Sequence, residues 1–372
     1  MAEIQVDEQA VEQARSYLSA RSADVNRVLG DFWQRKRKEW SDFPAIVPGA
    51  FDAYERLTGA GKKIRAGLLC LGYDAARRAD SPRPADADGV FRAAGAIEIL
   101  HNAFLIHDDI VDHADLRRSA PTVHRHYATL ARERFANDQE ALAYGSAVAL
   151  NFGDKGQALA QELLLASRFP PEVLLDAIRL LGQVTAETVA GQLLDVEDIR
   201  LPELTERQVL RIHEYKTAHY TIMLPLLMGA MLAGASSEAQ AATRRFAIPV
   251  GVAFQIQDDI LGLFGEERLL GKPVDSDVRE GKKTLLFVDA FAEASGADRQ
   301  CLARAHGNPE LDRADLDAVR RIVRESGALA RSEGLARRLV AEGKSHIAAM
   351  TTDPDARRIL LGLADYLIIR RT

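Results

Sequence analysis

The sequence predicts an all-α protein. Apolar residues recur at helical spacing along most of the chain; Ile97, Leu100 and Phe104, for example, lie at i, i+3 and i+7. The sequence shows no sustained alternation of apolar and polar residues, the pattern that marks a half-buried strand. Residues 300–372 form charged, amphipathic segments with short breaks at 307–310 and 353–354. These observations favour a helical bundle in one large domain.

The composition is that of a globular protein with a sizeable core. The 372 residues are 47% hydrophobic and 27% charged, and the formal net charge is −6. This acidic balance argues against general nucleic-acid binding, which favours a basic surface. The two cysteines, Cys70 and Cys301, argue against a disulfide framework and fit a reducing cytoplasm.

No stretch of the sequence has the pattern of a leader or a membrane anchor. The N-terminal MAEIQVDEQ lacks a basic region followed by an apolar one, so we expect no signal peptide. The most apolar window, residues 222–235, is too short to span a bilayer and contains Pro225. We therefore expect a cytoplasmic protein without an integral membrane segment.

The most informative stretch is residues 101–126, HNAFLIHDDIVDHADLRRSAPTVHRH. Its apolar helical run carries Asp108, Asp109 and Asp112. Asp108 and Asp112 lie at i and i+4, so they point to one side of a helix, one turn apart. Such carboxylates are costly to desolvate unless a cation binds them. The pattern suits Mg²⁺, which binds carboxylate and water oxygens and often shares phosphate oxygens.

Cationic side chains surround this acidic stripe in the sequence. Arg117 and Arg118 follow it, and a guanidinium group can bind phosphate oxygens through two hydrogen bonds. His101 lies one heptad before Asp108 and shares roughly its face. Taken alone, His101 is equally well explained as a core histidine bonded to a backbone carbonyl.

A second copy of this arrangement occupies residues 254–284, FQIQDDILGLFGEERLLGKPVDSDVREGKKT. Asp258 and Asp259 again interrupt an apolar helical run, and Gln255 lies on the same face. Three lysines follow in segments punctuated by glycine, namely Lys272, Lys282 and Lys283. Two acidic helix faces, each followed by a basic segment, suggest a metal cluster held between them and a diphosphate bound across it.

A third segment places a lysine in apolar surroundings. Thr205 is a candidate N-cap for the helix that carries Lys216 and Thr217. Lys216 precedes a strongly apolar run, which is unusual for a solvated lysine. Asp195, upstream, is either a surface residue or a partner for a water molecule or a lysine.

In these motifs the chain resembles the trans-type isoprenyl diphosphate synthases, the polyprenyl synthetase family. The resemblance runs from about residue 60 to 285 and, more weakly, to the C-terminus. The motifs are, in chain order, GKKIRA (61–66), DDIVD (108–112), RRSAPTVH (117–124), KTA (216–218), FQIQDD (254–259), GKP (271–273) and EGKKT (280–284). The first motif carries Lys63 and Ala66 where the family usually has arginine and proline.

This resemblance implies both a fold and an activity. It implies an isoprenoid synthase-type helical bundle around a central cavity, a single domain over residues 1–372 in which 1–45 form an N-terminal helical extension and 300–372 the C-terminal helices. The implied reaction is the Mg²⁺-dependent condensation of isopentenyl diphosphate with an allylic diphosphate, with three ions expected when substrate is bound. The family is usually homodimeric.

The resemblance also implies roles for individual residues. The metal ligands would be Asp108, Asp112 and Asp258. The allylic diphosphate would contact Arg117, Lys216 and Lys272. Isopentenyl diphosphate would contact Lys62, Arg65, His101 and Arg118. Further substrate contacts would come from Thr217, Gln255 and Lys282, and the catalytic set would be Asp108, Asp109, Asp112, Lys216 and Asp258.

Two residues on the first acidic helix bear on product length. Phe104 lies one turn before Asp108 on the same face, where a large ring suits the floor of a cavity for the growing chain. Its neighbour Ala103 is small and leaves room. In the family, aromatic residues four and five positions before the first motif limit product length. One bulky and one small residue favour a medium-chain product, geranylgeranyl or farnesyl diphosphate; the alternative is that Phe104 is a core residue.

One departure leaves a choice of function open. The second motif of the family usually ends in an aspartate, and here that position is Gly262. Either Asp258 binds metal with water completing the shell, or the chain is a non-catalytic partner subunit of a prenyl synthase. A class I terpene cyclase, which shares the helical fold, is a further alternative. The intact first motif and the basic segments favour the active enzyme.

Overall fold

The computed structural model describes residues 7–197, 201–265 and 276–369. Within these ranges the chain is helical, and the strands are the two-residue β1 (Leu116–Arg117) and β2 (Ala120–Pro121), which pair antiparallel. The predicted all-α class is therefore confirmed.

The chain divides into two compact units, each of which combines segments that are distant in the sequence. Unit 1 contains Met1–Arg15, Arg179–Leu227 and Ala235–Thr372, whereas unit 2 contains Ser16–Ile178 and Met228–Gly234. The single domain expected over residues 1–372 stays a prediction, and each unit is described by itself.

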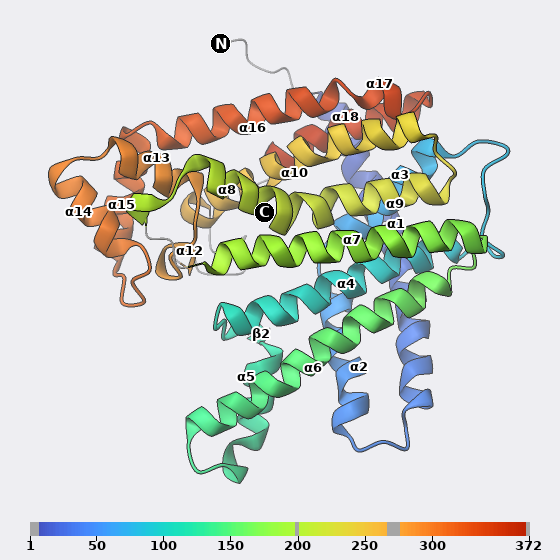
Figure 1. Cartoon of the computed structure of the whole chain (residues 1–372), viewed down its shortest axis with the longest axis horizontal. Helices are drawn as coiled ribbons and strands as arrows, with labels where there is room; N and C mark the ends of the chain where they lie inside the picture. The colour runs from blue at the N-terminus through green and yellow to red at the C-terminus, as the bar shows by residue number, and fades with distance from the viewer. Residues whose placement is uncertain (1–6, 198–200, 266–275, 370–372) are drawn as a thin grey trace. The chain divides into compact units, whose positions relative to one another are not determined.

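Unit 2 is built around the helix that carries the first acidic motif. Its elements are most of α1 (Glu8–Glu39), α2 (Ile46–Gly59), α3 (Ile64–Ala76), α4 (Gly89–Val111), β1, β2, α5 (Val123–Ala131), the 3₁₀ turn η1 (Arg132–Arg134), α6 (Asp138–Leu165), the start of α7 (Pro171–Val196) and the end of α9 (Leu224–Leu232). α4 packs against α2, α3 and α6 (Figure 1).

Small residues let α4 and α6 approach closely. A Cβ on Gly156 of α6 would lie 2.9 Å from the Cβ of Ala103 on α4 and 1.8 Å from the hydroxyl oxygen of Tyr54 on α2. The Tyr54 hydroxyl in turn donates to the Phe152 carbonyl over 2.7 Å. These contacts fix the face of α4 that points to the core and so determine the direction of its acidic end.

Unit 1 is built around the helix that carries the second acidic motif. Its elements include the end of α7, η2 (Leu201–Glu203), α8 (Glu206–Ile212), the π-helical η3 (His213–Met223), the start of α9, α10 (Ser237–Phe264), α12 (Ser276–Arg279), α13 (Leu285–Glu293), α14 (Gly296–Ala305), α15 (Arg313–Glu325), α16 (Ala328–Lys344), α17 (Ile347–Met350) and α18 (Pro354–Ile369). α10 packs against η3, α16, α17 and α18 (Figure 1).

Local signals explain how the lysine-bearing segment of unit 1 begins. Thr205 is the N-cap of α8, and its hydroxyl and the Gln208 side chain form a capping box, as expected from the sequence. The helix then widens into η3, whose backbone at Lys216 lies 2.2 Å from where a Cβ on Gly191 of α7 would be. Gly191 therefore allows η3 to lie directly against α7.

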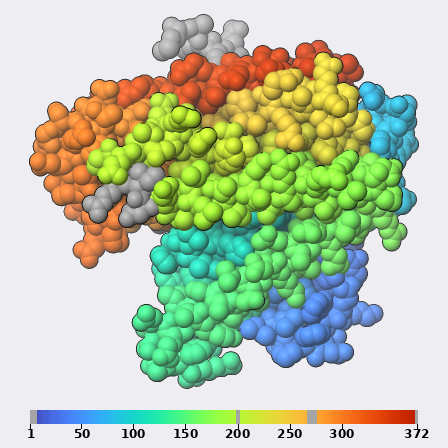
Figure 2. Space-filling model, in the orientation of Figure 1, coloured from blue at the N-terminus to red at the C-terminus, as the bar shows by residue number. Residues whose placement is uncertain are grey.

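The two central helices are long and apolar enough to cross a membrane by length and composition alone. They are α4 and α10, and 72% and 78% of their apolar windows are buried inside the protein. Burial of that extent is what core helices of a bundle show. At the surface of unit 2, α5 and the N-terminal part of α6 lie together (Figure 2), and Leu130 and Leu150 on these helices are 62% and 53% exposed.

Candidate active site

Cationic side chains from two segments of unit 2 gather around His101. They are Lys63 and Arg65 at the start of α3, and Arg117 and Arg118 in the hairpin after α4. His101 is only 8% exposed, and burial together with the positive charge of these four residues holds its pKa well below the usual range. The imidazole is therefore neutral at neutral pH, and an anion bound here would be stabilised by the surrounding cations.

The loop before α3 is shaped to admit one of these arginines. Gly61 has φ of +86°, and a Cβ there would lie 3.1 Å from Nη2 of Arg118. The Arg118 guanidinium also donates through Nη1 to the Leu57 carbonyl over 2.7 Å. Lys63 has φ of 51° and folds its ammonium back onto the Ala60 carbonyl at 2.8 Å. The glycine of GKKIRA is thus required by both backbone conformation and space.

The predicted isopentenyl diphosphate residues are not equally placed. Arg65 and Arg118 contribute charge around His101, whereas the side chain of Lys62 is exposed. Buried Glu98 accepts a hydrogen bond from the backbone N–H of Ala66 over 3.1 Å and so anchors the first turn of α3. Three of the four predicted residues, Arg65, His101 and Arg118, are therefore together.

The three carboxylates of the first acidic motif lie in different environments. Asp108 and Asp112 are half-buried, and the backbone N–H of Asp112 bonds to the Asp108 carbonyl at 2.8 Å, which keeps them one turn apart. Asp109 is 3% exposed and accepts from Nε of Arg117 over 2.9 Å. Burial raises the pKa of Asp109 although Arg117 opposes the shift. Asp109 is therefore the close, buried partner of Arg117, whose Nη2 lies 4.0 Å from Oδ2 of Asp108, while Asp108 and Asp112 are more exposed than Asp109.

The donor set at the end of α4 fits Mg²⁺ shared with a diphosphate. Such a site takes one or two carboxylates from the protein and the remaining oxygens from water and phosphate. Asp108 and Asp112 supply that number. In the part of the chain that the structure describes, no three His, Cys, Asp or Glu side chains are grouped as a complete metal cage.

In unit 1 the second acidic motif is tied into a larger polar network. Asp258 is half-buried, whereas Asp259 is 3% exposed. Asp259 lies 3.1 Å from Nζ of Lys282 and 3.0 Å from Nε2 of His213, and it accepts from Nε2 of Gln255 over 2.8 Å. Burial alone would raise the pKa of Asp259, but Lys282 and His213 hold it well below its usual range.

The lysine–threonine pair of η3 contacts side chains of α7 and α10. Thr217 donates to Oε1 of Gln255 over 2.9 Å, which extends the network from Asp259 to η3. Nζ of Lys216 lies 2.6 Å from Oδ2 of Asp195, so Asp195 is a lysine partner, one of the two alternatives left open by the sequence. Both residues of η3 are thus held by side chains before any ligand binds.

Some predicted residues stand apart from these contacts. Lys272 lies outside the described residues. Asp108 belongs to unit 2 and Asp258 to unit 1, so a metal cluster shared between them stays a prediction. Ala103 is fully buried against Gly156, whereas Phe104 is half-buried. Packing of α4 on α6 is therefore enough to explain the small size of Ala103, and the influence of both residues on product length stays a prediction.

Sequence reasoning missed His213 and assigned no contacts to Lys283 and Asp277. His213 lies beside Asp259 and was hidden within an apolar helix face. Lys283 donates from Nζ to the carbonyls of Leu194, Asp195 and Glu197 at 3.2, 2.6 and 2.5 Å, which places a cation at the C-terminal end of α7. Asp277 lies 3.5 Å from Nζ of Lys282. Only the unusual Gly262 signalled that a nearby residue had to fill its place.

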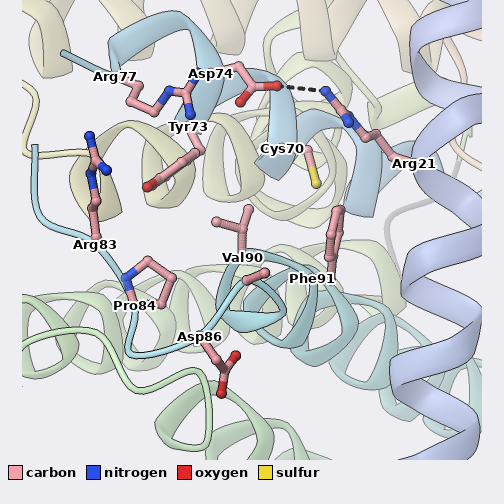
Figure 3. Close-up of a pocket in the computed structure, with 11 residues that line it drawn as sticks. Arg21, Cys70, Tyr73, Asp74, Arg77, Arg83, Pro84, Asp86, Val90 and Phe91 are labelled. Atoms are coloured by element: carbon pink, nitrogen blue, oxygen red, sulfur yellow. Dashed lines mark hydrogen bonds and ion pairs between the residues drawn. The ribbon is translucent and has the colours of Figure 1, made fainter. Parts of the chain in front are cut away.

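A cavity in unit 2 of about 430 Å³ lies away from these residues (Figure 3). Its lining includes Tyr73, Arg77 and Arg83, and Figure 3 shows the Arg21 guanidinium pointing to Asp74, with Nη2 3.0 Å from Oδ2. No predicted site residue lines it. Val90, which also lines it, precedes Asp108 by about five turns of α4, so this cavity is not the metal-binding end of the helix.

Comparison with known proteins identifies the family of this chain. A family model described as polyprenyl synthetase matches residues 50–323. The geranylgeranyl diphosphate synthase of Methanosarcina mazei is 31% identical over 310 residues, which are 83% of this chain and 86% of that protein. The (2E,6E)-farnesyl diphosphate synthase of Mycobacterium bovis is 30% identical over 314 residues, or 84% of this chain and 80% of that protein.

Solved structures agree with this assignment. A geranylgeranyl pyrophosphate synthase from Corynebacterium glutamicum, complexed with isoprenyl diphosphate and magnesium, has a TM-score of 0.88 and 29% identity, with 95% of this chain and 99% of that chain covered. A polyprenyl synthase from Caulobacter crescentus, complexed with calcium and isoprenyl diphosphate, has a TM-score of 0.78 and 28% identity, with coverage of 97% and 98%. The chain therefore belongs to the polyprenyl synthetase family and is a prenyltransferase.

Proposed function

We propose that this prenyltransferase condenses isopentenyl diphosphate with an allylic diphosphate, in a Mg²⁺-dependent reaction, to give geranylgeranyl or farnesyl diphosphate. The observation that carries the proposal is the neutral, buried His101 among four cationic side chains, in the same unit as the half-buried Asp108 and Asp112. That arrangement combines an anion-binding group with a metal-binding carboxylate pair. The names of the Methanosarcina and Mycobacterium relatives support the medium product length.

The metal would be held by the half-buried carboxylates of the two motifs. We assign Asp108, Asp112 and Asp258 as ligands and expect three ions when substrate is bound. When bound, Mg²⁺ stabilises negative charge on the departing diphosphate. The magnesium and calcium in the two similar solved structures, each with isoprenyl diphosphate, support this assignment.

The chain's own residues would hold the two diphosphates apart. Lys62, Arg65, His101 and Arg118 would bind isopentenyl diphosphate; Arg117, Lys216 and Lys272 would bind the allylic one. Because Asp195 holds the Lys216 ammonium at 2.6 Å, that charge is positioned before the substrate arrives. Preorganised charge of this kind lowers the barrier more than charge that must move into place. Thr217, Gln255 and Lys282 would contact substrate from the second network.

The reaction requires charge stabilisation and the exclusion of water. The allylic C–O bond breaks, the double bond of isopentenyl diphosphate attacks the allylic carbon, and a proton is then lost. We assign the proton to the departing diphosphate, because the sequence offers no obvious side-chain base. Apolar walls must exclude water that would otherwise quench the cation.

One incubation separates this function from the two alternatives. Purified protein is given Mg²⁺, isopentenyl diphosphate and each allylic primer in turn, and products are identified by mass. We expect elongated diphosphates. A hydrocarbon or alcohol formed from a single allylic substrate would instead indicate a terpene cyclase. Turnover that requires an added partner chain would indicate a regulatory subunit.

Product length is tested at the helix that carries the first motif. We expect Phe104→Ala to shift the product distribution to longer chains, because the ring would no longer close the cavity. Ala103→Leu is the matched variant: it should lower stability by about 2 kcal/mol through overpacking against Gly156. Chromatography of dephosphorylated products gives the lengths, and an unchanged length in Phe104→Ala would place this ring in the core only.

We further propose that the protein is cytoplasmic, homodimeric and independent of nucleic acid. The exposed leucines of α5 and α6, Leu130 and Leu150, support an apolar surface that a second copy could cover. Light scattering during size-exclusion chromatography gives the mass in solution, and a monomer at assay concentration would contradict the dimer.

A further inference from the structure

The position that lacks an aspartate in the second motif is filled from another element. A Cβ on Gly262 of α10 would lie 2.1 Å from Oδ2 and 3.0 Å from Cγ of Asp277. Asp277 belongs to α12 and is 7% exposed. A carboxylate therefore occupies the space beside α10 that a side chain at residue 262 would take.

The end of α12 fixes Asp277 relative to Lys282. The Lys282 N–H bonds to the Asp277 carbonyl at 2.9 Å, and the Gly281 N–H bonds to the Val278 carbonyl at 3.1 Å. Gly281 has φ of +66°. This pattern is a Schellman motif with glycine in the left-handed position. The glycine of EGKKT therefore turns the chain so that Lys282 returns toward Asp277.

The Lys282 ammonium is shared between two carboxylates. Its Nζ lies 3.1 Å from Oδ1 of Asp259 and 3.5 Å from Oδ2 of Asp277. Asp258 adds a further negative charge close by, and burial alone would lower the pKa of Lys282, but these carboxylates raise it well above its usual value. The ammonium is thus held between α10 and α12 beside the half-buried Asp258.

We propose that Asp277 is a positioning residue that supplies, from α12, the carboxylate missing at Gly262. It holds one side of the Lys282 ammonium while Asp259 holds the other, so that Lys282 stays beside Asp258, where the diphosphate binds. This role rests on the proposed function. Gly262 and Asp277 are then a coupled pair, in which a side chain at one position requires a short side chain at the other.

The test moves the carboxylate between the two positions. Asp277→Asn and Asp277→Ala remove the charge, and the double variant Gly262→Asp/Asp277→Ala returns a carboxylate to α10. The three atoms nearest to a Cβ on Gly262 all belong to the Asp277 carboxyl group, so Asp277→Ala clears the space for it. Asp298→Asn, at a partly exposed aspartate on α14 that also pairs with a basic side chain, is the matched control.

Binding of inorganic pyrophosphate in the presence of Mg²⁺ is measured by calorimetry, and the melting temperature of each protein is recorded with and without this ligand. We expect about tenfold weaker binding in Asp277→Asn and Asp277→Ala, the size expected for one charge-assisted hydrogen bond. The double variant should recover to within about threefold of wild type. Gly262→Ala should lower the melting temperature in the wild type but not in the Asp277→Ala background.

Each outcome decides the proposal. A lower melting temperature with unchanged pyrophosphate affinity in Asp277→Asn would make Asp277 a purely structural residue and overturn the inference. A folded double variant that binds no better than Asp277→Ala would show that the two positions are not equivalent. Wild-type protein that does not bind pyrophosphate with Mg²⁺ would contradict the proposed function itself, and the role of Asp277 would fall with it.

Discussion

The two acidic motifs begin with the same pair of aspartates but differ in how the charge of that pair is balanced. Each begins with a half-buried aspartate, Asp108 or Asp258, followed by one that is 3% exposed, Asp109 or Asp259. In the first motif the buried carboxylate pairs with an arginine, and its pKa is raised. In the second it contacts a lysine, a histidine and a glutamine, and its pKa is lowered.

This difference indicates how the charge of each motif is stabilised. Around the first motif positive charge exceeds what the buried carboxylate needs, because Arg65 and Arg118 remain close to His101. Around the second motif Lys282 lies between two carboxylates. The first region is thus suited to an incoming anion, whereas the second is internally balanced and depends on its own lysine.

The largest expected effect is the loss of activity when the half-buried first aspartate of either motif is removed. Asp108→Ala and Asp258→Ala should each lower kcat by about 1000-fold, or about 4 kcal/mol, because each removes a carboxylate that would bind metal. Their melting temperatures should change little, since both residues are half-buried. Asp115→Ala, an exposed aspartate after the first motif, should retain wild-type kcat. A small effect at Asp258 alone would mean that the second motif does not hold metal.

The next prediction compares the free energy of unfolding that is lost when the cation of each region is removed. Lys282→Met leaves Asp259 and Asp277, which are 3% and 7% exposed, without their shared ammonium, and should cost about 3 kcal/mol. Arg117→Met removes the close partner of Asp109 and a weaker one, 4.0 Å away, of the half-buried Asp108. Because burial already raises the pKa of Asp109, this carboxyl can take up a proton, and the cost should be about 2 kcal/mol.

Urea denaturation gives both free energies of unfolding. Lys38→Met on the exposed face of α1 is the control, and its free energy should stay within about 0.5 kcal/mol of wild type. Equal losses in Lys282→Met and Arg117→Met would contradict the difference drawn between the two regions.

Much of this comparison was visible in the sequence. The helical spacing of apolar residues, such as Ile97, Leu100 and Phe104, together with the lack of strand-like alternation, was enough to predict an all-α fold. The N-cap at Thr205 also followed from its position before a periodic segment. These signals are local, so a single stretch of chain is sufficient to show them.

The contacts that distinguish the motifs were not visible, because they join residues distant in the sequence. Nothing local marks Asp277 as the neighbour of Gly262, which lies fifteen residues before it in the chain. Likewise, the sequence shows Ala103 as a small residue but not that Gly156 and Tyr54 lie against it. Such pairings depend on how the helices pack, which periodicity does not determine.

A smaller effect concerns the pH dependence of the first region. The pKa of His101 in the folded protein lies below its unfolded value, so the unfolded chain binds a proton that the folded chain does not. Stability should therefore fall as the pH drops below about 6.5, by roughly 1–2 kcal/mol between pH 7 and 5. His101→Asn should lose this part of the slope.

Free energies of unfolding measured between pH 5 and 8 test this expectation. His113→Asn is the control substitution, because His113 is exposed and asparagine tolerates its φ of 52°. Pyrophosphate should reduce the slope, since a bound anion offsets the cations around His101. A slope that does not change in His101→Asn would show that other groups produce it.

The smallest effect comes from the turns that follow the two motifs. After the first, Ser119 is at φ of 62° in the tight turn between β1 and β2; after the second, Gly281 is at φ of 66°. Because a left-handed conformation costs a residue with a Cβ about 1 kcal/mol relative to glycine, Ser119→Gly should stabilise the protein by up to that amount. Gly281→Ala should destabilise it by at least as much, since its Cβ would also lie 3.1 Å from the Cα of Gly307. Thermal unfolding of both variants gives the signs, and a destabilised Ser119→Gly would mean that the serine side chain contributes more than the strain of its backbone costs.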